Sequence, residues 1–234
     1  MSRTITKIIR TNADIAAGVR HLRRVCPVMR TIHDRTGDPP LRRYEAGFEG
    51  LARIVTGQQL SIASAAAIWS RVHASLQPFT PEALLAASDA RLEGCGLSRA
   101  KIRTLRTLSG AIASGDLELD GLARAEDATV RAALTAVSGI GPWTADIYVL
   151  FCLGRADAWA AGDLALQVGA ARATGEGERL NAVELETLAE RWRPWRGVAA
   201  RLIWADYAYL RRLPGAGEVA GRPPPRLSRI SGKP

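Results

Sequence analysis

The sequence predicts an all-α protein, and three observations support that prediction. Apolar residues recur at helical spacing, as at Ile15, Val19 and Leu22. Helix-start signals recur as well: the stretch 80–82, TPE, joins a capping hydroxyl, a proline at the first helical position and an early acid. Neither strand-like alternation nor a fixed-period repeat is evident. A chain of 234 residues can bury a sizeable core, as one large domain or as two small lobes.

Breaks and caps divide the chain into the expected helices. The first apolar helix ends before Pro27, and residues 27–43, which hold a double proline, include a connector. The serine of the turn 94–98, GCGLS, opens a long helix, and the stretch 181–184, NAVE, has the form of a capping box. Beyond the connector, the main expected helices run from about Phe48 to Thr56, Ser61 to Leu76, Arg99 to Ala113, Asp127 to Val137, Pro142 to Leu153 and Pro194 to about Leu210.

Positive charge is concentrated near the C-terminus. Lysine and arginine number 32 against 23 acidic residues, which gives a formal net charge of +9 and a sequence pI near 10.3. That balance favours a polyanionic partner. Residues 213–234 combine prolines, glycines and scattered arginines with few large apolar side chains, and we expect them to form a flexible basic tail. Residues 211–234 hold six basic residues against one acidic residue, +5 of the net +9. The rest of the chain is only mildly basic, so the prediction of a nucleic-acid partner depends on motifs rather than on charge.

The stretch 134–146, LTAVSGIGPWTAD, is the most informative part of the chain. It predicts a helix, a hairpin too tight for side chains and a second helix. Gly139 and Gly141 permit backbone angles closed to other residues and leave amide N–H groups uncovered, and Pro142 suits the first turn of the second helix. Uncovered amides at a helix N-terminus bind anions, and a DNA phosphate is the usual occupant of such a hairpin. The alternative is a glycine-rich turn without a ligand.

Nothing in the composition indicates a disulfide framework, a transition-metal site or a membrane partner. Cys26, Cys95 and Cys152 are widely spaced, which fits a reduced cytosol. The 3 histidines show no paired His/Cys spacing. The first residues lack the apolar stretch of a signal peptide, and no run approaches transmembrane length. We therefore expect a cytoplasmic protein, nucleoid-associated in a bacterium.

Four motifs follow one another along the chain. They are the stretch 54–61 (IVTGQQLS), the hairpin, the stretch 159–167 (WAAGDLALQ) that contains Asp163, and the stretch 190–196 (ERWRPWR) followed by Ile203 and Trp204. Together they resemble the helix-hairpin-helix superfamily of DNA base-excision glycosylases, and within it the alkylation-repair branch of DNA-3-methyladenine glycosylase II. The resemblance covers about residues 44–210.

The resemblance implies a two-lobed helical bundle with a helix-hairpin-helix motif and a substrate cleft between the lobes. One glycosylase domain would span residues 1–212. Its middle lobe is expected at about 44–132, and its second lobe at about 1–43 plus 133–212.

The activity that the resemblance implies is monofunctional base removal from double-stranded DNA. The protein would flip an alkylated purine of the 3-methyladenine type out of the duplex and hydrolyse its N-glycosidic bond in base-excision repair. We expect a monomer that requires no cofactor. An iron–sulfur cluster is not expected, because 3 cysteines cannot hold the four-cysteine cluster of related branches. Two alternatives remain: a glycosylase for another damaged or mismatched base, and a non-catalytic helix-hairpin-helix DNA-binding protein.

Asp163 is the candidate catalytic residue. A glycosidic bond breaks through an oxocarbenium-like sugar, which a nearby carboxylate stabilises. The resemblance gives Asp163 that role, either towards the cation directly or in aligning a water molecule. The alternative is that Asp163 only caps the helix that begins at Leu164, and both roles are compatible. Many relatives have a proline shortly before this aspartate, where this chain has residues 160–162, AAG.

Tryptophans are the candidate residues of the base pocket. Bifunctional relatives usually carry a lysine at the position of Trp143, and its amine forms a Schiff base that an indole cannot form. The sequence therefore predicts no AP-lyase activity. The resemblance places Trp143 in an aromatic wall that attracts a cationic purine, and Trp204 and Trp159 are further candidates for that wall. A core position is the alternative for Trp204 and Trp159.

The resemblance also implies DNA contacts and a cation site. The resemblance places Gln58, Gln59 and Leu60 in a loop that enters the duplex, with Gln59 or Leu60 as the wedge that fills the gap left by the flipped nucleotide. A polar turn at a helix end is the alternative. In the hairpin, Gly139, Gly141 and Thr144 would bind DNA. A structural monovalent cation, Na⁺ or K⁺, would lie on the main-chain carbonyls of Thr135, Val137 and Gly139.

Overall fold

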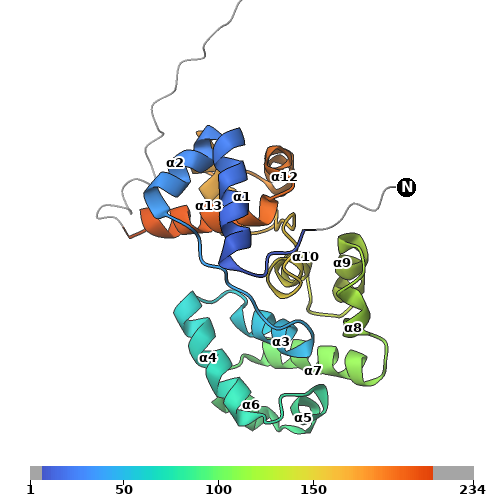
Figure 1. Cartoon of the computed structure of the whole chain (residues 1–234). Coiled ribbons are helices and arrows are strands. Elements are labelled where there is room, and N and C mark those ends of the chain that lie inside the picture. The colour runs from blue at the N-terminus through green and yellow to red at the C-terminus, as the bar shows by residue number, and fades with distance from the viewer. Residues whose placement is uncertain (1–6, 213–234) are drawn as a thin grey trace, which may run out of the picture. The chain divides into compact units, whose positions relative to one another are not determined.

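The structure, a computed structural model, describes residues 7–212, and this part of the chain is built from helices (Figure 1). An isolated antiparallel bridge joins Ile8 to Arg155. The all-α prediction is confirmed. The expected basic tail, residues 213–234, lies outside the described residues. Among residues 7–212, no helix combines the length and the apolarity that crossing a membrane requires.

The chain divides into two compact units, each made of two stretches. Unit 1 contains residues 7–10 of the described chain and Arg42–Ala158. Unit 2 contains Thr11–Leu41 and the chain from Trp159 onward.

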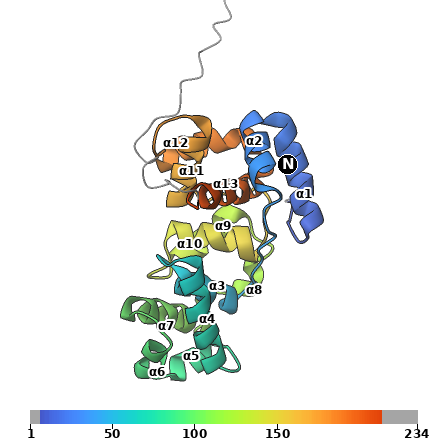
Figure 2. The same ribbon diagram turned by 90° about the vertical axis from the view of Figure 1, so that its left-hand side faces the viewer.

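Unit 1 carries the hairpin and most of the short helices. Its elements are α3 (Phe48–Gly57), α4 (Ile62–Ser75), α5 (Pro81–Ala86), α6 (Asp89–Gly94), α7 (Arg99–Ala113), α8 (Leu119–Leu122), α9 (Asp127–Thr135), α10 (Pro142–Ile147) and the π-helical turn η1 (Tyr148–Cys152). Helices α5 and α6 pack against α7 in both views (Figures 1 and 2). Helix α3 contacts α4, α7, α10 and η1, so it is the central element of this unit.

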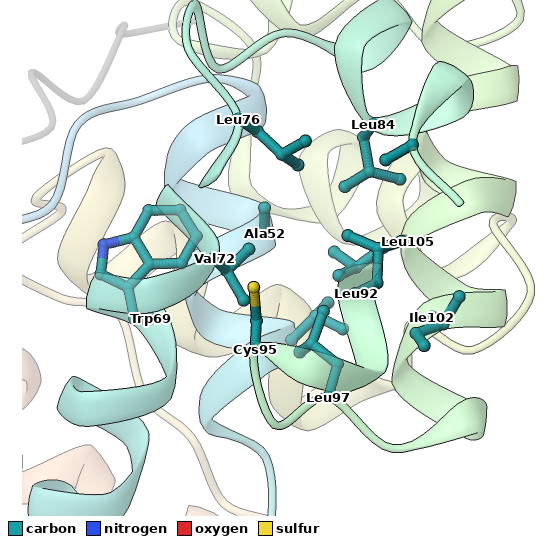
Figure 3. Packing of buried hydrophobic residues seen from close by; sticks show 12 residues of the cluster. Ala52, Trp69, Val72, Leu76, Leu84, Leu92, Cys95, Leu97, Ile102 and Leu105 are labelled. Atoms are coloured by element: carbon teal, nitrogen blue, oxygen red, sulfur yellow. The ribbon is translucent and has the colours of Figure 1, made fainter. Parts of the chain in front are cut away.

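A buried apolar cluster joins α3 to α7 (Figure 3). Leu84, Leu92 and Leu105 are fully buried in it. Burying each of these side chains stabilises the fold by about 1.5–3 kcal/mol relative to leaving it exposed. The full cluster contains Ala52, Val55, Trp69, Val72, Leu76, Leu84, Ala87, Leu92, Cys95, Leu97, Ile102 and Leu105.

Unit 2 is organised around its last helix. Its elements are α1 (Asn12–Val25), α2 (Pro27–Thr36), α11 (Leu164–Thr174), α12 (Ala182–Ala189), the 3₁₀ turn η2 (Glu190–Trp192) and α13 (Arg196–Leu210). Helix α13 packs against α1, α2 and α11. Its buried Asp206 accepts a hydrogen bond from Arg35 Nε on α2 at 2.7 Å. Burial raises the pKa of the Asp206 carboxyl, and the hydrogen bond from Arg35 opposes that rise.

The division into units differs from the predicted lobes at two places. Residues 7–10 and residues 133–158 were both expected in the second lobe, whereas in the structure they belong to unit 1. The later segment belongs there because α10 and η1 lie against α3 and α9 lies against α10, and residues 7–10 belong there because their backbone bonds to that of residues 154–156.

The predicted helices agree with the structure where local signals were strong. Helix α7 has the expected bounds, Arg99–Ala113. Thr80 caps α5 and Asn181 caps α12 as expected, and Asn181 and Glu184 form a reciprocal capping box. The expected connector 27–43 contains a helix that the sequence analysis missed, α2, which begins directly at Pro27 and buries Met29 and Ile32.

The three cysteines are free and buried. Cys152, in η1, is 1% exposed. Burial raises the pKa of its thiol to about 12, although the positive charges of Arg43 and Arg53 act in the opposite direction.

A test of the packing of α1 on α13 is the substitution Gly18→Ala. A Cβ at this position would lie 2.6 Å from Val198 Cγ2 and 2.8 Å from Trp195 Cε3, both on buried side chains. We expect the free energy of unfolding to fall by about 1–3 kcal/mol, as for other overpacked cores. Urea unfolding measures the change.

Gly110→Ala is the matched control, because Gly110 also lies inside a helix but its added Cβ would meet nothing within 4 Å. This control should be neutral or stabilising by up to about 1 kcal/mol. Equal effects of the two substitutions would contradict the packing described for α1.

Candidate functional site

The hairpin between α9 and α10 needs a glycine at one position but not at the other. Gly139 has φ +90°, and a Cβ there would lie 2.2 Å from Thr104 Oγ1 on α7. Gly141, the N-cap of α10, has φ −90° and ψ 174°, and an added Cβ would meet nothing within 4 Å. Ile140 between them is 3% exposed and anchors the turn in the interior of unit 1. The hairpin is therefore held tightly against α7 while both glycines stay exposed.

Two further contacts hold the helices around this turn. Arg131 Nε on α9 donates to Asp146 Oδ1 on α10 at 2.5 Å. The N–H of Ile140 donates to the carbonyl of Val137 at 3.0 Å, which closes the turn.

A carbonyl oxygen has two lone pairs, so the hydrogen bond from Ile140 is compatible with a cation on the Val137 carbonyl. Among residues 7–212, no cluster of three or more His, Cys, Asp or Glu side chains could hold a metal ion.

Thr144, one of the residues expected to bind DNA, has a buried side chain. Its side chain is 2% exposed, and its hydroxyl accepts a hydrogen bond from Gln58 Nε2 at 2.8 Å. The hydroxyl lies on the inner side of α10 because that side packs against α3. This side chain holds the loop after α3, and DNA binding by Thr144 stays a prediction.

The loop after α3 presents its next two residues outward. Gln59 is exposed with φ +56°, a left-handed conformation that is uncommon for a residue with a side chain. Leu60 is 39% exposed. Before them, Lys101 Nζ on α7 donates to the carbonyl of Thr56 at 2.7 Å, and partial burial lowers the pKa of this amine. Lys101 and Gln58 thus fix the start of the loop, and Gln59 and Leu60 remain on its surface.

Asp163 begins α11 and accepts two hydrogen bonds on one oxygen. Its Oδ1 accepts the backbone N–H of Leu166 at 2.9 Å, the bond of an N-cap. The same Oδ1 accepts the indole N–H of Trp204, on α13, also at 2.9 Å. The capping role expected as an alternative for Asp163 is confirmed, and it leaves a catalytic role open.

The loop before Asp163 is fixed by residues that the sequence analysis did not select. Gln167 is 4% exposed, and its Nε2 donates to the carbonyl of Ala161 at 2.9 Å. Its Oε1 accepts from Arg179 Nε at 2.8 Å, and the N–H of Asp163 donates to the carbonyl of Ala160 at 2.9 Å. One feature of the sequence could have indicated Gln167: it is a glutamine within an otherwise apolar helical stretch. A buried amide there needs hydrogen-bond partners.

The candidate pocket tryptophans differ in burial. Trp143 and Trp204 are half-buried. Trp159 is 2% exposed, and its ring packs on that of Trp192 at a centroid distance of 5.4 Å in the interior of unit 2. This packing favours the core position that was the alternative for Trp159, and the pocket roles of Trp159, Trp143 and Trp204 stay predictions.

A glycine hairpin followed in sequence by an aspartate that caps a helix is characteristic of one class of DNA base-excision repair protein. The family model of the HhH-GPD superfamily base excision DNA repair protein matches residues 52–195, more than half of the chain. The chain belongs to this superfamily.

Relatives within the superfamily share moderate sequence identity with the chain. The DNA-3-methyladenine glycosylase 2 of Escherichia coli is 29% identical over 168 residues, which are 67% of this chain and 56% of that protein. The probable bifunctional transcriptional activator/DNA repair enzyme AlkA of Mycobacterium tuberculosis is 36% identical over 106 residues, 45% of this chain and 20% of that protein. The chain thus spans only a fifth of the mycobacterial relative and just over half of the enterobacterial one.

Solved structures agree with the fold. The DNA-3-methyladenine glycosidase of Bacillus halodurans superposes with a TM-score of 0.69 at 31% identity, over 88% of this chain and 96% of that one. The 3-methyladenine DNA glycosylase Mag1 of Schizosaccharomyces pombe, in complex with abasic DNA, superposes with a TM-score of 0.74 at 24% identity, over 84% and 97% of the two chains.

The two hairpin glycines should respond differently to substitution by alanine. Gly139→Ala combines a left-handed residue with a contact to Thr104 that is too short, so the free energy of unfolding should fall by about 2–5 kcal/mol. Gly141→Ala, the matched control, loses only the slight N-cap preference of glycine over alanine, about 1 kcal/mol or less. Denaturant titrations of both variants measure the difference. A Gly141→Ala variant as unstable as Gly139→Ala would show that the hairpin has another geometry.

Proposed function

We propose that this chain is a monofunctional DNA glycosylase that removes alkylated purines of the 3-methyladenine type from double-stranded DNA. One observation supports the proposal above the others: Asp163, within the segment that matches the superfamily, has its carboxylate fixed by two N–H donors at the start of α11. The names of the relatives supply the substrate class, since several are 3-methyladenine glycosylases.

The proposed reaction needs a fixed negative charge. The bond between C1′ of the sugar and the purine breaks with its electron pair leaving on the base, and an alkylated, cationic base accepts that pair readily. Water then adds to C1′ and loses a proton, which leaves an abasic site. The Asp163 carboxylate would stabilise the positive charge on the sugar or align the water, and a preorganised charge does so without reorganisation.

DNA binding is assigned to unit 1 in this proposal. The exposed glycines of the hairpin leave main-chain N–H groups of Gly139 and Gly141 accessible to a phosphate. Gln59 or Leu60, displayed on the loop after α3, would fill the gap left by the flipped nucleotide. Gln58 contributes by holding that loop through Thr144. The half-buried Trp143 would stack on the base.

A monovalent cation is compatible with the hairpin. The carbonyls of Thr135, Val137 and Gly139 belong to one turn, and carbonyl oxygens suit a hard cation such as Na⁺ or K⁺. Such an ion would link the turn to a phosphate and would take no part in bond cleavage. We propose a cytoplasmic monomer that works without an iron–sulfur cluster, since the sequence holds 3 cysteines.

The first test is Asp163→Asn, which keeps an oxygen that can cap α11 and accept from Trp204 but removes the charge. We expect excision to slow by about 10²–10³ while duplex affinity stays near the wild-type value. Single-turnover assays on duplexes with 3-methyladenine, 7-methylguanine, hypoxanthine, 1-methyladenine or 8-oxoguanine measure the rate.

The same substrate panel separates the alternatives. Fast wild-type excision of 8-oxoguanine alone would favour a sibling glycosylase. No excision of any base, with DNA binding retained, would favour a non-catalytic DNA-binding protein. An Asp163→Asn variant at wild-type speed would reduce Asp163 to a helix cap.

A second test concerns the product. Trp143 offers no amine, and lysine occurs only as Lys7, Lys101 and Lys233, of which Lys101 is committed to the Thr56 carbonyl. Borohydride added during the reaction should therefore trap no covalent protein–DNA adduct, and the abasic strand should stay intact until alkali is added. A bifunctional glycosylase treated in the same way is the positive control. A trapped adduct would disprove the monofunctional assignment.

A further inference from the structure

A hydrogen bond between Trp204 and Asp163 restricts the orientation of the Asp163 carboxylate. The indole N–H is a donor only, and here it donates to Oδ1 of the residue that begins α11, at 2.9 Å. The backbone N–H of Leu166 donates to the same oxygen at the same distance. Two donors from different elements fix both the position and the rotation of this carboxylate, whereas a cap alone leaves its rotation less restricted.

The fold brings the two side chains together by a close approach of α11 and α13. A Cβ at Gly169 of α11 would lie 2.7 Å from Ile203 Cγ2 of α13, so the two helices are nearer there than side chains on both would allow. Ile203 is adjacent in sequence to Trp204, and Gly169 lies within the second turn after Asp163. The register of the two helices therefore places the indole at the N-terminus of α11.

We propose that Trp204 is a positioning residue that orients the Asp163 carboxylate through the hydrogen bond from its indole N–H. This inference rests on the proposed function, because it takes Asp163 as the carboxylate that acts on the sugar. It differs from the expectation for Trp204 as a pocket wall, in which the aromatic ring contacts the base. Trp204 then contributes to the rate of bond cleavage through the orientation of Asp163, and this contribution vanishes when the carboxylate is absent.

The substitution Trp204→Phe tests the proposal, because it keeps an aromatic ring and removes the N–H. We expect the single-turnover rate constant at saturating enzyme to fall by about 10- to 100-fold, as for loss of a hydrogen bond to a charged group that orients a reactive one. Affinity for duplex DNA should stay within about twofold. A purely structural defect would lower the reaction amplitude, since fewer molecules would be active, and would leave the rate constant unchanged.

A double-mutant cycle identifies the route by which Trp204 acts. In the Asp163→Asn background, Trp204→Phe should change the remaining rate by less than about twofold, because the charge to be positioned is gone. Tyr207→Phe is the matched control: it removes one polar atom from the same helix and should leave the rate constant unchanged.

The outcomes separate this proposal from the proposed function. A wild-type rate in Trp204→Phe, or an equal fold-loss in both backgrounds, would overturn the positioning role while Asp163→Asn stays slow. A wild-type rate in Asp163→Asn would overturn the proposed function itself.

Discussion

The close packing of α11 against α13 is the constraint on which the arrangement at Asp163 depends. Gly169 permits it, since any side chain there would meet Ile203. Separating the two helices would break the bond between Asp163 and Trp204 without changing either residue. The fixed orientation of the Asp163 carboxylate therefore depends on Gly169, a residue that has no side chain and no reactive group. Stability and the geometry of the proposed site are linked through this one contact.

A glycine also permits a close approach in unit 1, at the hairpin. Gly139 approaches Thr104 more closely than a Cβ would allow, and this brings the turn against α7. The loop after α3 is held in a comparable way by two long polar side chains, since Lys101 reaches the Thr56 carbonyl and Gln58 reaches α10. Such residues restrict the backbone of a surface loop without covering it, so the exposed side chains keep their access to a partner.

Short-range signals made much of the fold predictable, and long-range contacts account for what was missed. The Thr80 cap, the bounds of α7 and the capping role of Asp163 all depend on residues three or four apart. The bond from Trp204 to Asp163 joins residues far apart in sequence, as does the bond from Gln58 to Thr144. Neither hydrogen bond produces a periodic pattern in the sequence. Helix α2 was missed for a different reason: it follows α1 almost without a linker, so its proline was interpreted as a break.

The burial of the cysteines has a consequence for chemical durability. The proposed activity would place the protein where methylating electrophiles are present, and the thiolate is the form of cysteine that attacks such electrophiles. Cys26, Cys95 and Cys152 are each less than a tenth exposed, and Cys152 has a thiol pKa of about 12. At neutral pH that thiol stays protonated, and its sulfur is screened from solvent. The packing that stabilises the fold thus also protects Cys152 from the reagents that would create the proposed substrates.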